Sequence, residues 1–293
     1  MLYLWRVMAA VALLAPLSFP SYAAKTPVSG VAPAVLAVEV DKAKLARDVD
    51  QLLALLDVDV DVTFLHDSEV RLLDNGKENG AIPKVSWPHL DAAVKTAFAA
   101  ERLRRIIRQS FIENIDPAYL PEMLAWYDSD LGKKITEVQN KVMNFVGEEA
   151  MFAYRDNPQS APPSESRLKL LRRLDDLTQS SANEDIILQN MQKIFVDGFA
   201  FYQKNSAGDV KKITDLITDN RTRTAQRTVL SMAFIYRELS DVELEQNLTF
   251  LASPAGKKFV AVANLAERRV WTDIHKNHLL LMMGQMIDKL DPP

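Results

Sequence analysis

The chain has 293 residues, of which 48% are hydrophobic, so it is long enough to bury a sizeable core in one or two units. Its 35 basic and 39 acidic residues give a net charge of −4, which does not suit a polyanionic partner and argues against nucleic-acid binding. The chain contains no cysteine. This excludes disulfide bonds, cysteine-ligated zinc, thiol nucleophiles and the lipid-modified cysteine of a lipoprotein.

The first residues have the pattern of a secretory signal peptide. Arg6 precedes an apolar run at 7–19, and small residues follow that run. The run is shorter than the ~20 residues of a typical membrane-spanning helix. We therefore expect residues 1–23 to be removed by cleavage after Ala23, or alternatively after Ala24, and the mature chain to reach the periplasm. An uncleaved anchor is the alternative, and no later stretch is apolar enough to span a bilayer.

A short leader and a first helical unit follow. Residues 24–40 contain small residues and two prolines, which is typical of a flexible segment. In the first unit, 41–154, apolar residues recur with the helical period of 3.6. The pattern predicts helices near 41–56, 88–112, 117–128 and 130–152. Residues 58–64 alternate like a strand, but a lone strand has no partner, so a helix or irregular turn is favoured.

The second unit follows a segment that breaks helices. Residues 155–166 combine three prolines with three serines, which is typical of a linker. Helical periodicity then resumes over 167–290, where Asn183 offers a cap for a helix that continues to Tyr202. The other helices of this unit are predicted near 167–178, 208–218, 222–238, 241–252 and 254–290, the last with an interruption.

Two blocks of the sequence resemble each other. Residues 120–135 match residues 244–259 at most large apolar positions, and both blocks contain Gly-Lys-Lys, beginning at Gly132 and at Gly256. A unit present twice would set the domain count and explain most of the unusual residues. The fold predicted is all-α, with two tandem related helical-bundle units. Independent convergence on a short helical corner is the alternative.

The second block has the signals of a tight corner between two helices. Ser240 and Glu243 have the form of a capping box, which begins a helix at residue 241. Ser253 and Pro254 supply a new N-cap and a proline at the first helical position, so a second helix begins there. Gly256 lies in the first turn beyond the corner, where a residue without Cβ lets two backbones approach closely.

We expect one such structural corner in each unit. Pro121 would kink or restart the first unit's helix, and Asp130 stands where the second unit has proline. The predicted corner residues are Leu124, Trp126, Ser129, Gly132 and Lys133 in the first unit, and Leu248, Phe250, Ser253, Pro254, Gly256 and Lys257 in the second.

The second block, from Glu243-Leu244 through Phe250 to Ser253-Pro254-Ala255-Gly256-Lys257, resembles the bacterial domain of unknown function 2059 family. That family has the core Glu-Leu, then Phe-Tyr-x-Ser-Pro-x-Gly-Lys. Here Leu251 replaces the tyrosine, and the first block departs further from the pattern. The resemblance implies two copies, the second closer to the family pattern, in an exported helical protein of Gram-negative bacteria. It implies no activity.

The Gly-Lys pair at a helix N-terminus also invites comparison with phosphate-binding loops. A Walker loop needs a glycine five positions before Gly256 and a serine or threonine after Lys257, but Leu251 and Lys258 stand there. The corner is therefore interpreted as a structural joint, with a weak anion or partner contact as the alternative.

Catalytic motifs are absent from the sequence. Ser166 and Lys169 fit a Ser-x-x-Lys pattern, but its companion motifs are missing, so Ser166 is interpreted as a helix cap. Glu148 and Glu149 are adjacent, and neighbours on a helix point about 100° apart, so this pair does not flank one glycosidic bond. We predict no catalytic residue and no cofactor.

Two further charged groups receive structural interpretations. His275 and His278 share a helical face, but two imidazoles do not complete a metal site, so no metal is predicted. Arg104, Arg105 and Arg108 line one face of a predicted helix, which is typical of a solvent face with ion pairs. Binding to acidic partners or lipid head groups is the alternative.

Together these features predict an exported periplasmic protein that acts as a binding or interaction module without catalysis. Its partner would be an envelope protein or a small apolar ligand, because helical bundles present grooves and enclose cavities. A carrier of a lipid-like ligand between helices is one alternative. An uncharacterised envelope hydrolase is the second, and it requires acidic residues from distant helices to meet in space.

Overall fold

The structure, a computed structural model, describes residues 41–80, 87–190 and 224–274. Within these ranges every regular element is a helix and none is a strand, which confirms the all-α prediction. No helix in them combines the length and apolar character needed to cross a bilayer. Several predicted features lie outside the described residues: the signal peptide 1–23, the leader 24–40, the helix 208–218, and His275 and His278.

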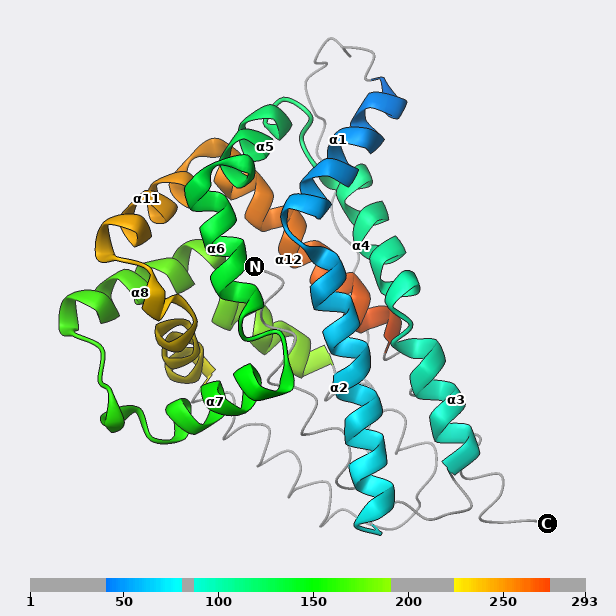
Figure 1. The fold of residues 1–293 in the computed structure, drawn as a ribbon. Coiled ribbons are helices and arrows are strands. Elements are labelled where there is room, and N and C mark those ends of the chain that lie inside the picture. The colour runs from blue at the N-terminus through cyan, green and yellow to red at the C-terminus, as the bar shows by residue number, and fades with distance from the viewer. Residues whose placement is uncertain (1–40, 81–86, 191–223, 275–293) are drawn as a thin grey trace, which may run out of the picture.

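The helices follow one another closely along the chain (Figure 1). The first half contains α1 (Lys42–Leu55), α2 (Val58–Glu78), α3 (Trp87–Ala97), α4 (Ala100–Asn114), α5 (Leu120–Asp128), α6 (Asp130–Asn140) and α7 (Phe145–Asp156). A break holding the 3-10 turn η3 (Pro158–Ser160) leads to α8 (Glu165–Thr178). Helical residues 180–190 and 224–235 come next, followed by η4 (Tyr236–Glu238), α11 (Asp241–Ala252) and α12 (Pro254–Ile274).

The alternating segment 58–64 is helical, as favoured from the sequence. Val58, Val62 and Leu65 lie at helical spacing and are all buried, so these three residues form one apolar helix face. The helix also continues to Glu78, well beyond the predicted segment. Its length follows from this face, which packs on α3 and α4.

The prediction of one helix over 88–112 was wrong, because the chain breaks between α3 and α4. Phe98 and Ala99 leave the helical path, and the Phe98 side chain enters the core. The carbonyl of Phe98 lies 3.1 Å from Nδ1 of His66 on α2. A side chain of another helix thus offers this carbonyl a partner, and burial of the ring compensates for the interruption.

The prediction of one helix over 130–152 was also wrong, because α6 ends before α7 begins. Asn144 caps α7, and its side chain accepts a hydrogen bond of 2.9 Å from the backbone N–H of Gly147. A Cβ on Gly147 would lie 2.5 Å from the carbonyl oxygen of Lys141. The chain therefore turns sharply here. The Asn-x-x-Gly pattern marks the start of a new helix, but the spacing of apolar residues alone does not reveal it.

At three helix starts the structure differs from the predicted kink or cap residue. Helix α5 begins at Leu120, so Pro121 lies in its first turn, where a missing N–H costs little, and produces no kink. Ser164, rather than Ser166, caps α8 by accepting from the N–H of Arg167 at 3.1 Å. Asn183 is not a cap, because the helical run already includes residue 180.

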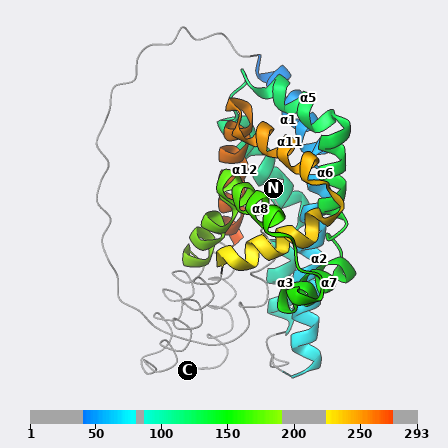
Figure 2. The same ribbon diagram turned by 90° about the vertical axis from the view of Figure 1, so that its left-hand side faces the viewer.

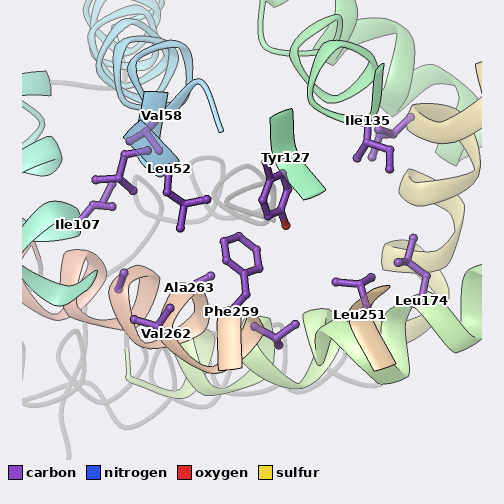
Figure 3. Packing of buried hydrophobic residues seen from close by; sticks show 14 of the residues in the cluster. Leu52, Val58, Ile107, Tyr127, Ile135, Leu174, Leu251, Phe259, Val262 and Ala263 are labelled. Atoms are coloured by element: carbon purple, nitrogen blue, oxygen red, sulfur yellow. The ribbon is translucent and has the colours of Figure 1, made fainter. Parts of the chain in front are cut away.

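One hydrophobic core joins both halves of the chain (Figure 3). Helix α12 runs behind α1 and α2 towards α4 in Figure 1, and α8 and α11 lie in front of it in Figure 2. The ring of Phe259 on α12 lies 4.8 Å from that of Tyr127 and 6.2 Å from that of Phe111. The halves therefore share their apolar interior.

Ion pairs at the edge of this core fasten α12 to α4. Arg102 donates three hydrogen bonds of 2.7–3.0 Å to the carboxylate of Asp273, an arrangement that fixes both position and angle. One turn earlier on α12, Arg269 donates to Glu113 at 2.6 Å. The last part of α12 is thus held to the first half of the chain.

Replacing Phe259 by alanine should destabilise the whole molecule. The side chain is 1% exposed, so its removal leaves a cavity at the junction of the halves and should cost about 3–5 kcal/mol. Denaturant unfolding followed by circular dichroism should show one transition, shifted as a unit. Val242→Ala, at a side chain 68% exposed, should change stability by less than ~0.5 kcal/mol. Two separate transitions, one of them unshifted, would contradict the shared core.

Candidate functional site

The two predicted corners have the same backbone geometry. Ser129, between α5 and α6, has φ −67° and ψ 158°, and Ser253, between α11 and α12, has φ −67° and ψ 163°. The Ser129 hydroxyl accepts a hydrogen bond of 3.1 Å from the N–H of Gly132, and the Ser253 hydroxyl accepts one of 3.1 Å from Gly256. Each serine is therefore a helix N-cap that also sets the direction of the turn.

Both corners require glycine. A Cβ on Gly132 would lie 2.1 Å from the carbonyl oxygen of Trp126, and a Cβ on Gly256 would lie 2.1 Å from that of Phe250. The obstructing atoms belong to the backbone, so a flexible side chain cannot move aside to relieve the clash. The close approach of the two helices is possible only without a side chain at these positions.

The corners also contact each other. Trp126 stacks on Phe250 with ring centroids 4.6 Å apart and planes 7° apart, and these two residues are 124 positions apart, like the two glycines. Stacking of this kind stabilises by roughly 0.5–1.5 kcal/mol beyond area burial. Leu248 is buried beside Phe250, and Leu124 packs against the core near Trp126.

Ion pairs cross between the corners in both directions. Lys134 pairs with Glu243 at 2.5 Å, and Lys258, again 124 positions later, pairs with Asp116 at 3.4 Å. The Lys134 ammonium and then the Ser240 N–H and hydroxyl hold the pKa of Glu243 down at about 2. Each corner thus places a lysine against an acid of the other half.

The remaining corner residues lie at the start of the outgoing helices. Pro254 is the first residue of α12, and the aspartate that replaces it begins α6, where a negative charge suits the helix dipole. Lys133 and Lys257 are exposed, and Lys133 pairs with Asp128 at 2.8 Å. The corner residues therefore serve mainly the joint itself.

The arginine face of α4 is largely paired within the fold. Arg104 hydrogen-bonds to Asp59 on α2, and Arg108 donates bonds of 2.6 and 3.0 Å to Asp50 on α1. Arg105 is exposed. These pairs match the predicted solvent face with ion pairs and leave less charge for an acidic partner.

The structure brings together two buried glutamates that were not predicted. Glu184 lies in the helical segment 180–190 and Glu267 lies on α12, and they are 3% and 1% exposed. Asn183 donates a hydrogen bond of 2.6 Å to Oε2 of Glu267 and accepts one of 2.6 Å from Arg268. Thr228 donates a bond of 3.1 Å to Oε2 of Glu184. We call these residues the carboxyl cluster.

Burial controls the protonation of both acids. It raises the pKa of Glu267 to about 8, and the neighbouring Glu184 carboxyl acts in the same direction. Burial also raises the pKa of Glu184 to about 7, against the opposing effects of the Thr228 hydrogen bond and of Arg227 and Arg155. Both groups therefore retain protons far above the usual range for glutamate.

A signal for the cluster exists in the sequence. Glu267 continues the spacing of the buried residues Val260, Ala263, Val270 and Ile274 on α12, so it falls within an apolar stripe. Glu184 likewise stands three positions before the buried Ile187. A charged residue in an apolar stripe predicts a buried polar group, but its partner cannot be found from periodicity. No group of three potential metal-ligating residues occurs within the described ranges.

The chain is thus a helical protein built around two serine–glycine corners that meet in one core. A family model described as "Uncharacterized protein conserved in bacteria (DUF2059)" matches residues 101–151. That segment runs from α4 into α7 and contains the first corner. The expected resemblance is confirmed there, whereas a second copy is not shown and the match does not lie in the unit expected to be closer. No curated protein and no solved structure matches the chain.

Gly256→Ala should open the second corner. Its Cβ would overlap the Phe250 carbonyl, so the helices must separate and the Trp126 stack must weaken, at a cost of about 3 kcal/mol or more. Gly132→Ala should behave alike. Thermal unfolding measures the effect, with Lys257→Ala as the control at a neighbouring exposed position, expected within ~0.5 kcal/mol of the parent. Equal stabilities of the glycine and lysine variants would contradict the corner mechanism.

Proposed function

We propose that this chain is an exported periplasmic protein that acts as a binding module without catalysis and contains one helical unit twice, at 41–154 and 167–290. The observation that carries the proposal is that the corner residues all make structural contacts. Serine hydroxyls cap helices, glycines admit a close backbone approach, and the aromatic rings stack on each other. The motif thus serves a scaffold, and a scaffold of packed helices suits recognition.

Equivalent contacts in the two halves support the duplication. Helix α1 packs on α5 as α8 packs on α11, and α12 packs on α4 as α6 packs on η4. Asn140 hydrogen-bonds to Asp57 in the turn after α1, and Asn264, 124 positions later, hydrogen-bonds to the carbonyl of Thr178 at the end of α8. The exchange of α12 and α6 between the halves resembles a two-fold symmetric pair of subunits.

The carboxyl cluster is the one observation that favours the alternative of an envelope hydrolase. Two acids from distant parts of the sequence are buried, and Glu184 contributes to the raised pKa of Glu267. General acid–base hydrolysis, however, needs environments that push the two pKa values apart. Here burial raises both, to about 7 for Glu184 and about 8 for Glu267, so the pair lacks a clear division into acid and base. Binding is therefore the better supported function.

If the protein is exported, its signal peptide should be removed. Protein recovered from the periplasm should have an intact mass that begins at Ala24 or Lys25, because the signal peptidase cuts after a small residue. Ala23→Phe removes the small residue at the favoured site and should leave a larger share of full-length precursor in the membrane fraction. Recovery of the unprocessed parent chain from the cytoplasm alone would contradict export.

If the protein is a binding module, a bound partner should copurify with it. Native mass spectrometry of the protein purified from its own periplasm should show an envelope protein at fixed stoichiometry, and the same chain lacking residues 1–23, kept in the cytoplasm, should lack it. A retained small apolar molecule would instead favour the carrier alternative, in which a cavity between helices holds the ligand. A bare monomer in both preparations would contradict the binding module.

A further inference from the structure

The two halves differ chemically at equivalent places. In the first half, Asp59 and Arg104 form an exposed ion pair between α2 and α4. Offsets of 125 and 124 positions carry these residues onto Glu184 and Thr228, which contact each other inside the protein. A solvated charge pair in one half thus corresponds to a buried carboxyl–hydroxyl hydrogen bond in the other.

The buried acids have few compensating partners. Glu267 accepts one hydrogen bond, from the neutral amide of Asn183, and its Oε1 has no partner within the described residues. Arg268 donates to Asn183 rather than to either carboxyl. An ionised carboxylate buried in this way is costly, whereas a protonated one is tolerated.

We propose that Glu184 and Glu267 form a proton-controlled latch. When both carboxyls are protonated, they hold the helical segments 180–190 and 224–235 against the last part of α12. When they ionise, two negative charges share one buried space, and the segments separate from α12 to hydrate them.

Charged groups on neighbouring described elements shift the pKa values of both acids in opposing directions. Arg155 of α7 and Arg227 of the segment 224–235 favour ionisation of Glu184, while Asp185 opposes it. Glu267 is opposed by Glu184 and favoured by Arg268. Both carboxyls therefore titrate well above the usual range of glutamate, Glu184 with a pKa of about 7 and Glu267 with a pKa of about 8.

The direction of the pH effect follows from proton binding. An exposed glutamate has a pKa near 4.5, so the closed state binds more protons than the open state between that value and about 8. The latch is complete on the acidic side and weakens as the pH rises through 7 and 8. From pH 6 to pH 9 the closed-to-open ratio should fall about 10-fold through Glu184 and about 100-fold through Glu267.

Hydrogen exchange read by mass spectrometry tests the latch on the full mature chain between pH 6 and pH 9. Each rate is divided by the intrinsic exchange rate at the same pH. Segments 180–190, 224–235 and 264–274 should lose protection by 100- to 1000-fold, whereas α5 and α6 should keep theirs. The variant Glu184→Gln/Glu267→Gln should show no such loss, because neither amide titrates.

Asp59→Asn, at the equivalent exposed position, is the matched control and should follow the parent profile. Glu267→Gln alone should retain only the ~10-fold dependence that comes from Glu184, so one folded single variant suffices if the double variant does not fold. Glu69 on α2 is a separate buried acid with a pKa of about 8, which is why α5 and α6 serve as the reference. Flat parent protection, an equal loss in the glutamine variants, or a parallel loss in α5 and α6 would overturn the latch.

Discussion

The close approach of backbone to backbone at two glycines is the constraint on which this structure depends. At Gly132 and Gly256 a carbonyl oxygen occupies the space of a side chain, so each outgoing helix leaves its corner at one angle only. That angle brings Trp126 against Phe250 and directs α12 onto α4. The hydroxyls of the two cap serines accept hydrogen bonds from the N–H groups of Gly132 and Gly256, which the sharp turn would otherwise leave without a partner.

The same angle explains why the halves share one interior. A helix that leaves its own bundle at a corner must cover its apolar face elsewhere, and α12 covers it on the first half. Ion pairs such as Arg102 with Asp273 then form at the rim, where they fix the crossing and add little energy. The 3-10 turn at Pro158–Ser160 links the halves along the chain, but the packing of the shared apolar core holds them together.

Features with local causes were predictable from the sequence, and features with tertiary causes were not. Neighbouring residues in the sequence are enough to predict the Ser240 capping box, the start of α12 at Pro254 and the glycine corners. The break at Phe98 depends on the burial of its side chain in the core and on His66, 32 residues away, so the helical periodicity of the sequence gives no sign of it. The carboxyl cluster could not be predicted for the same reason. Asn183 and Glu267 lie 84 residues apart in the sequence, and neither residue alone predicts the contact.

The two halves of the chain place several of their acidic residues differently. The segment that matches a known family lies in the first half, where Asp50 and Asp59 are exposed and pair with arginines. In the second half Glu184 and Glu267 are buried and burial raises the pKa of both, as it does for Glu69 in the first half. A buried carboxyl pair costs desolvation energy that a hydrophobic interior would not, and the response available to two buried carboxyl groups is to protons.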